Sequence, residues 1–231
     1  MQEPELMDIL RKAWDNYKHN AKLLTLVATF GAAIPLIAYT VYSYYIQISV
    51  SLNSSHIGAS THSSFGIVNL AILIVLVIIL YATKVGLINI SFKILKNEQI
   101  SYKDAFLAND TLVELFKAGI FVGFLTFLGT IFCIIPGIII SFLFSLVPFI
   151  LLFDSRKTIG ESLTASRKLM TKYIKVTLLI TLIEFAITTI AGATVVGVII
   201  SMPLTIMIDA VLLTTLAEIE NSNDKANNIL R

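Results

Sequence analysis

The sequence predicts an all-α, polytopic membrane protein with six transmembrane helices arranged as three hairpins, each preceded by a cytoplasmic interfacial amphipathic helix. Three observations lead to this prediction: an apolar composition, apolar segments long enough to cross a bilayer, and an uneven distribution of basic residues. Of 231 residues, 56% are hydrophobic and 14% are charged, and the mean hydropathy is +0.85. Soluble domains carry about 45–50% apolar and about 25% charged residues. We therefore expect a single integral membrane domain, residues 1–231.

A helix needs ~20 residues to cross ~30 Å of hydrocarbon. By this length, the apolar segments of the chain form six predicted spans. Two segments have about the required length, and two longer ones are long enough for a crossing and a return. The small residues of "IAGATVVG" divide the last of these segments. The six spans cover residues 23–46, 67–90, 118–135, 138–153, 174–191 and 196–217.

A Pro-Gly pair, Pro136 and Gly137, interrupts the run from Ala118 to Phe153, which has no charged side chain. Proline removes a backbone donor and disfavours helical geometry in the residue before it, and glycine tolerates turn conformations. Basic residues lie on both sides of the run, so its two ends should face the same compartment. We expect a hairpin with Pro136 and Gly137 at or near its outer tip. The short arms leave open a re-entrant pair that stops within the bilayer.

Lysine and arginine gather on one side of the predicted spans. They precede the first span, flank the third and fourth, and close the chain, whereas the loop of residues 47–66 has no charged residue. Basic residues concentrate on the cytoplasmic side of membrane proteins. Both termini are therefore expected in the cytoplasm.

A polar stretch with helical apolar spacing precedes each predicted hairpin. In the first, one face of the helix carries Ile9, Leu10, Ala13, Trp14 and Tyr17. We expect such helices to lie along the cytoplasmic surface, with the apolar side in lipid and the basic side toward anionic headgroups. They would anchor the spans or dock a cytoplasmic partner.

The third of these helices should begin at a capping box formed by Thr158 and Glu161. Its predicted interfacial residues are Leu163, Met170, Arg167 and Lys168.

Three charged residues, Lys84, Glu184 and Asp209, fall inside the second, fifth and sixth spans. Each lies nine residues from a charged residue near the cytoplasmic boundary, or ~13 Å along a helix, so the three should share one level of the bilayer. A charge that faces lipid costs ~2.5–3.5 kcal/mol or more, so these side chains should turn inward and pair. One lysine between two carboxylates leaves one negative charge or one bound proton.

Two interpretations of these charges stay open. In the first, the unpaired carboxylate belongs to a proton- or cation-coupled path, near which Pro203 interrupts the helix and which Thr188 and Thr205 could line. Alternatively, a buried ion pair fixes the helix packing while Lys84 extends to the cytoplasmic interface.

The stretch "IIPGIIISFLFSLVPFILLFDSRKTIGESLTASRKLM", residues 134–170, opens a span with Pro-Gly-Ile, carries Pro148 late in that span and continues into a Ser-rich basic helix. It resembles the bacterial YciC-like inner-membrane proteins and is similar to the membrane domain attached to some glycerophosphoryl diester phosphodiesterases. The N-terminal "ILRKAWDNYKHN" fits the same group. The resemblance implies a bacterial cytoplasmic-membrane protein with about six spans. It does not include Lys84, Glu184 or Asp209, and 231 residues leave no room for a phosphodiesterase barrel of ~250 residues.

The composition also bears on partners and cofactors. A net charge of +2 is too near zero to indicate nucleic acid, and no basic run with interleaved aromatic residues follows a phosphate backbone. One cysteine, Cys133, cannot form an intramolecular disulfide or a thiolate metal cluster. We expect the protein to have a lipid bilayer as its partner and to bind no nucleic acid, no metal and no cofactor. A cytoplasmic or membrane protein partner and any oligomeric state stay open.

No phosphate loop, nucleophile elbow or metalloprotease helix is present in the sequence, so we expect no enzyme. The leading hypothesis is a non-enzymatic multi-pass membrane protein that acts as an envelope or assembly scaffold. The alternative is a small transporter or ion-conducting protein coupled through Glu184 and Asp209. A third hypothesis, an intramembrane hydrolase, requires a serine or histidine within hydrogen-bond reach of Asp209.

Overall fold

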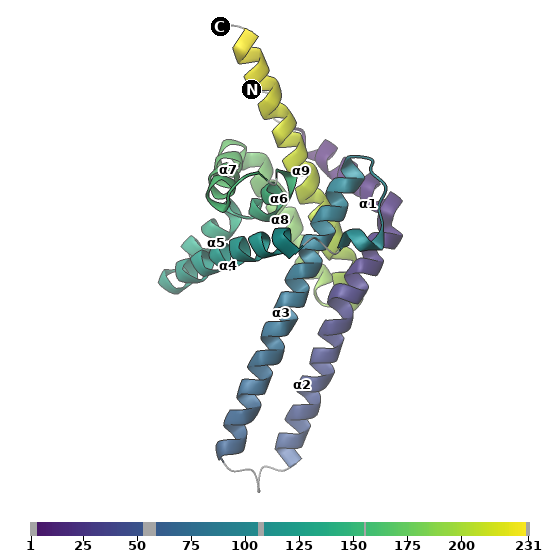
Figure 1. Ribbon diagram of the computed structural model, residues 1–231, viewed down its shortest axis with the longest axis vertical. Coiled ribbons are helices and arrows are strands. Elements are labelled where there is room, and N and C mark those ends of the chain that lie inside the picture. Colours follow the sequence, from purple (N-terminus) through teal and green to yellow (C-terminus); the bar gives the residue numbers. More distant parts are fainter. Residues whose placement is uncertain (1–3, 53–58, 106–108, 155, 230–231) are drawn as a thin grey trace.

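A computed structural model describes residues 4–52, 59–105, 109–154 and 156–229 (Figure 1). Within these residues the elements are α-helices, one π-helical turn (Thr29–Ala33) and one 3₁₀ turn (Tyr102–Ala105), and there is no β-strand. The α-helices are α1 (Leu6–Ala28), α2 (Ile34–Leu52), α3 (Ala59–Leu95), α4 (Asn109–Phe132), α5 (Ile134–Leu143), α6 (Val147–Phe153), α7 (Ile159–Lys172), α8 (Ile174–Ala191) and α9 (Val195–Ile229).

Six helical segments are long and apolar enough to cross a membrane, which confirms the predicted number. They are Leu6–Ile48, Val68–Leu95, Leu112–Phe132, Ile134–Phe153, Ile174–Ala191 and Val196–Ser222. The main difference lies at the N-terminus, where the expected surface helix and the first span form one continuous helical segment. Nothing between them stops a helix, because the polar stretch holds no proline or glycine before Gly31.

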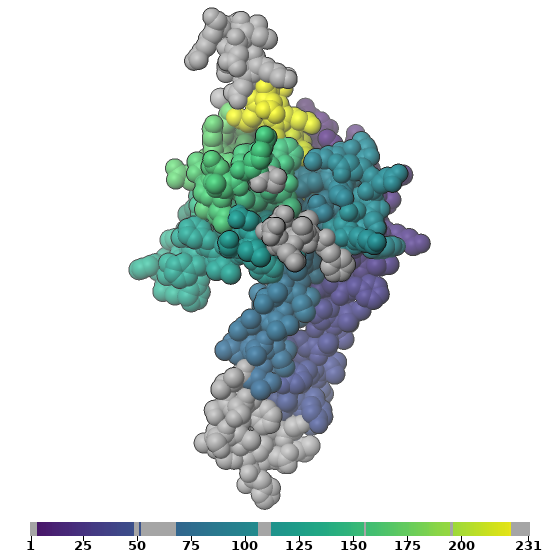
Figure 2. All heavy atoms as spheres, in the orientation of Figure 1, coloured from purple at the N-terminus to yellow at the C-terminus, as the bar shows by residue number. Residues whose placement is uncertain are grey.

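The helices form a compact head from which two helix pairs project (Figure 1). α2 and α3 lie side by side as a long pair, and α4 and α5 form a second pair that points in a different direction. α9 packs against α1, α3 and α8. The space-filling view shows the α2–α3 pair standing apart from the wider head (Figure 2).

The core lies in the head, around the middle of α9. Fully buried apolar side chains come together there from α1, α3, α6 and α9, including Leu24, Leu87, Phe149, Met207 and Leu212. The projecting part of α2 and α3 instead exposes large apolar side chains, among them Val41, Tyr44, Leu70, Ile74 and Val75. So large an apolar surface is tolerated only against lipid or a partner, as expected for membrane spans.

The turn of the third and fourth spans lies slightly before its predicted position. α4 ends at Phe132 and α5 begins at Ile134, so Cys133, with an extended backbone (φ −170°), alone separates the two helices. Pro136 lies in the first turn of α5, where the backbone N–H that it lacks would have no intrahelical partner. Gly137 faces α4, because a Cβ on it would lie 2.2 Å from Thr130 Oγ1. The pair therefore marks the helix crossing just after the turn, not the tip.

The predicted single span 138–153 is divided into α5 and α6. Pro148 occupies the second position of α6, and its missing N–H leaves the Phe144 carbonyl without the usual donor. That carbonyl accepts instead from the Val147 N–H at 3.2 Å, in a tighter turn between the two helices. The break therefore follows from Pro148.

Several apolar side chains of the expected first and third surface helices pack on protein. In α1, Ile9, Ala13 and Tyr17 are buried against the head. In α7, Met170 is only 1% exposed and Leu163 is half-buried. Amphipathic spacing identifies an apolar face but not what covers it, so the lipid-facing orientation was wrong for these residues.

The remaining features of α7 agree with the sequence. The Thr158 side chain accepts from the Glu161 backbone N–H at 3.3 Å, and the Thr158 N–H donates to Glu161 Oε2 at 2.8 Å. The predicted capping box is thus formed, and the bonds that Glu161 Oε2 accepts from the Thr158 N–H and the Thr158 hydroxyl hold the pKa of Glu161 below its ordinary value. Arg167 and Lys168 are exposed.

Candidate functional site

Three helices bring Lys84, Glu184 and Asp209 together, and we refer to these residues as the charge cluster. Asp209 lies on α9, which packs against both α3, with Lys84, and α8, with Glu184. Glu184 interacts electrostatically with Asp209 and with Lys84, and Asp209 interacts with Lys84. Their proximity in space is consistent with the prediction, made from helical spacing, that the three residues share one level.

The charge cluster does not contain the expected ion pair. Across the described residues, salt bridges join other partners, and none links Lys84 to either carboxylate. The Lys84 side chain is exposed, whereas Glu184 and Asp209 are half-buried. Glu184 Oε1 is itself fully buried and has no hydrogen-bond partner in the described chain. A buried acceptor without a donor costs ~1–3 kcal/mol, and more when it is charged, so this oxygen is poised to bind a proton or a cation.

An apolar layer separates the charge cluster from the polar end of α9. Leu212, Leu213 and Leu216, which follow Asp209 toward Glu218, are buried. On the other side of Asp209, Pro203 lies inside α9 and leaves one carbonyl of the preceding turn without its intrahelical donor. The helix can bend at such a position.

The threonines expected near these charges satisfy their hydroxyl protons on their own helices. Thr188 Oγ1 donates to the Glu184 carbonyl at 2.7 Å, and Thr205 Oγ1 donates to the Ser201 carbonyl at 3.1 Å. Their oxygens can still accept a hydrogen bond or coordinate a cation. Among the described residues, no serine or histidine donates a hydrogen bond to Asp209, so the hydrolase hypothesis gains no support.

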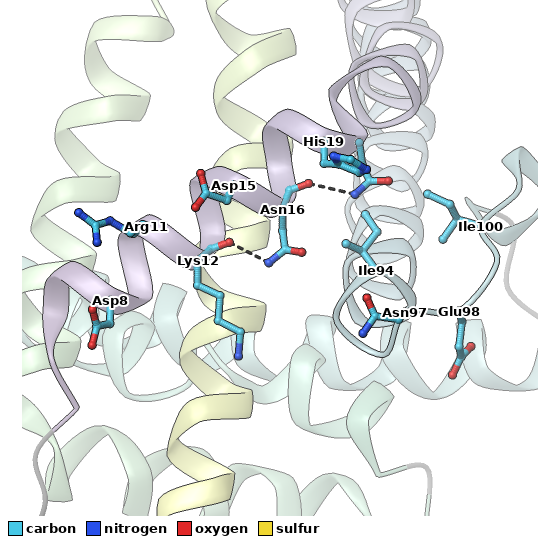
Figure 3. Close-up of a pocket in the computed structure, with 11 residues that line it drawn as sticks. Asp8, Arg11, Lys12, Asp15, Asn16, His19, Ile94, Asn97, Glu98 and Ile100 are labelled. Atoms are coloured by element: carbon cyan, nitrogen blue, oxygen red, sulfur yellow. Dashed lines mark hydrogen bonds between the residues drawn. The ribbon is translucent and has the colours of Figure 1, made fainter.

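A second candidate site, which the sequence analysis missed, is a polar hollow of about 750 Å³ between α1 and the end of α3 (Figure 3). It is lined by Asp8, Arg11, Lys12, Asp15, Asn16, His19, Asn20, Ile94, Asn97, Glu98 and Ile100. The α1 residues recur at helical spacing on one polar face, and this signal is visible in the sequence. The opposite wall comes from residues 94–100, whose position depends on the fold.

The far wall of the polar hollow is held in place by the segment that follows α3. Lys93 Nζ donates to Asp104 Oδ1 at 2.6 Å, and the Ser101 N–H donates to Asp104 Oδ2 at 2.7 Å. These bonds hold the pKa of the Asp104 carboxyl below its ordinary value of 3.8. Asn89 Nδ2 donates to the Asp104 carbonyl at 2.8 Å. Close packing also requires Gly86, where a Cβ would lie 2.2 Å from the Ala105 carbonyl oxygen.

The chain matches no family model, and comparisons with curated proteins and with solved structures find no similar protein.

Proposed function

We propose that the chain is a non-enzymatic multi-pass protein of the bacterial cytoplasmic membrane and that it works as a small transporter or ion-conducting protein coupled through Glu184 and Asp209. In this proposal the spans form three hairpins and both termini lie in the cytoplasm. The distribution of basic residues supports the orientation, and the resemblance to YciC-like proteins supports the compartment. The observation that carries the transport proposal is the buried Glu184 Oε1, which has no hydrogen-bond partner among the described residues.

The charge count within the membrane favours this function over a purely structural role. A buried ion pair offsets the desolvation cost of its charges only when the two groups are in close contact, and among the described residues no such contact joins Lys84 to the two carboxylates. Two carboxylates against one ammonium leave a single negative charge that a proton or a small cation would neutralise. Ionisable groups inside membranes commonly mark ion pathways and proton relays.

Movement of α9 would control access to the charge cluster. With the C-terminus in the cytoplasm, the buried leucines between Asp209 and Glu218 would close the cytoplasmic side, so an ion that reaches Asp209 from the cytoplasm would require this apolar layer to open. A bend at Pro203 would move the layer relative to α3 and α8.

Flux into proteoliposomes tests the proposal. We expect the native protein to carry protons or monovalent cations faster than empty liposomes, and Glu184→Gln and Asp209→Asn each to lower this flux at least tenfold. Glu114→Gln is the matched control, because Glu114 is exposed and its carboxylate lies 3.9 Å from Lys117. Thermal unfolding of each variant is measured in parallel. Absence of flux, together with lower stability of Glu184→Gln and Asp209→Asn, would show that the cluster serves packing alone.

The scaffold hypothesis is the second candidate, and the exposed apolar surface of the α2–α3 pair favours it. The docking face expected on α7 is reduced, because Met170 is buried, and in this proposal a partner helix would contact the projecting pair within the membrane. Photo-crosslinking residues at Val41 and Ile74 should then capture one protein at stoichiometric yield in native membranes, and a probe at buried Leu87 should capture none. Crosslinks to lipid alone would contradict the scaffold hypothesis.

A further inference from the structure

We propose that the polar hollow between α1 and the end of α3 binds a zwitterion in which a phosphate lies beside a primary ammonium. A phospholipid headgroup of the ethanolamine type has this chemistry, and so does the free phosphoamine. The proposal does not depend on the transport function, because the hollow and the charge cluster have no residue in common.

The hollow has the size of a small-molecule site and carries charges of both signs. Its volume of about 750 Å³ falls within the ~300–1,000 Å³ of typical ligand pockets. Two permanent cations and three carboxylates line it: Arg11, Lys12, Asp8, Asp15 and Glu98. A zwitterion is the class of ligand that could bind both the cations and the carboxylates of the hollow.

These charges are not paired with one another. On α1 they are three or four residues apart, a spacing at which opposite charges commonly meet, yet the salt bridges of the described chain involve none of them. In Figure 3 the side chains of Lys12 and Asn16 extend from α1 toward the side on which Ile94 and Asn97 lie, whereas the Arg11 side chain points away from them. Lys12 is thus directly available to a ligand between the two walls, and Arg11 would have to turn toward it.

Two asparagines add acceptors of fixed orientation. Asn16 Nδ2 donates to the Lys12 carbonyl at 2.8 Å and Asn20 Nδ2 donates to the Asn16 carbonyl at 3.0 Å (Figure 3). Both side-chain carbonyl oxygens are therefore left to accept. A primary ammonium has three N–H donors for such oxygens and for the carboxylates, whereas a quaternary ammonium has none. The guanidinium of Arg11 and the ammonium of Lys12 suit the phosphate.

The neighbouring surface of α1 has the character of a membrane interface. Trp14 is 47% exposed, and Lys18 Nζ lies 5.8 Å from the centroid of its ring. Tryptophan and lysine in this combination are typical of the headgroup level of a bilayer. Because α1 continues into the first span, we expect the polar hollow to lie near the level of the lipid headgroups.

Native mass spectrometry of the delipidated full-length protein tests the proposal. The protein is mixed with equimolar phosphatidylethanolamine, phosphatidylcholine and phosphatidylglycerol, which differ in headgroup charge and in N–H donors. We expect at least fivefold preference for phosphatidylethanolamine, and we expect Lys12→Gln and Glu98→Gln each to lower its binding at least fivefold. Lys175→Gln is the control, because Lys175 is an exposed lysine that does not line the hollow. Circular dichroism verifies that each variant is folded.

Competition by free phosphoethanolamine distinguishes binding of the phospholipid headgroup from binding of the free phosphoamine. If it displaces the lipid at micromolar concentration, the hollow binds the soluble zwitterion, and if it does not, the hollow binds the lipid. Equal binding of the three lipids, or equal losses in Lys12→Gln and Lys175→Gln, would overturn the proposal.

Discussion

Replacement of Gly137 by alanine tests the close crossing of α4 and α5. A Cβ at this position would lie 2.2 Å from Thr130 Oγ1, 2.9 Å from Thr130 N and 3.0 Å from Thr130 Cα. Rotation of the threonine side chain would not relieve the two backbone contacts, and it would break the bond from Thr130 Oγ1 to the Thr126 carbonyl at 2.8 Å. The two helices must therefore separate.

The size of the effect follows from two costs and one opposing gain. Overpacking costs ~1–3 kcal/mol, and the lost hydrogen bond costs ~0.5–1.5 kcal/mol. Alanine regains ~1 kcal/mol over glycine inside a helix. We expect Gly137→Ala to lower the free energy of unfolding by ~0.5–3.5 kcal/mol.

Gly123 on α4 provides the matched control, because a Cβ there would meet nothing within 4 Å. Gly123→Ala should raise the free energy of unfolding by up to ~1 kcal/mol. Both variants are unfolded reversibly in mixed micelles with increasing dodecyl sulfate and followed by circular dichroism. If Gly137→Ala proves as stable as Gly123→Ala, the close crossing does not exist in the membrane protein.

Three further predictions concern Cys133, the helix cap at Thr158 and the carboxylate of Asp104. Cys133 is exposed at the α4–α5 turn, so an impermeant maleimide should label it from the periplasmic side of spheroplasts but not from inside-out vesicles; the reverse pattern would contradict the proposed orientation. Thr158→Ala should lower the free energy of unfolding by ~1 kcal/mol through loss of the helix cap, whereas Thr171→Ala, which changes an exposed hydroxyl on the same helix, should have little effect in the same assay. Because Lys93 lowers the pKa of Asp104 below 3.8, the carboxylate stabilises the segment of residues 97–105 above that pH and loses this effect as the pH falls through the lowered pKa. Hydrogen exchange, corrected for its intrinsic pH dependence, should show constant protection of this segment from pH 7 to pH 5 and a loss at lower pH; in Asp104→Asn the protection should be low at every pH.

Local properties of the chain were predictable from the sequence. The number of spans follows from the length and hydropathy of each segment, and the capping box of Thr158 and Glu161 follows from a four-residue pattern. The break before α6 could also have been read from Pro148. In contrast, the exact turn between α4 and α5 depends on how closely Gly137 approaches another helix, and this is a tertiary property.

The charge cluster and the polar hollow also depend on tertiary contacts that the sequence does not reveal. Helical periodicity placed the residues of the charge cluster at one level, but the absence of a direct contact to Lys84 depends on the rotation of three helices about their axes. Met170 lies on an apolar face that lipid or protein could have covered. The polar hollow needs two walls that are distant in the chain, so only the α1 wall has a sequence signal.

The single-residue connection at Cys133 constrains how the chain enters the membrane. Gly129 and Gly137, four residues on either side of it, lie against each other, since a Cβ on Gly129 would be 3.0 Å from Gly137 Cα. Without a loop between the two helices, the first cannot settle in the bilayer while the second is still outside. We expect the two helices to leave the translocon together as a preformed hairpin, so that hardly any unpaired backbone has to be transferred across the hydrocarbon region.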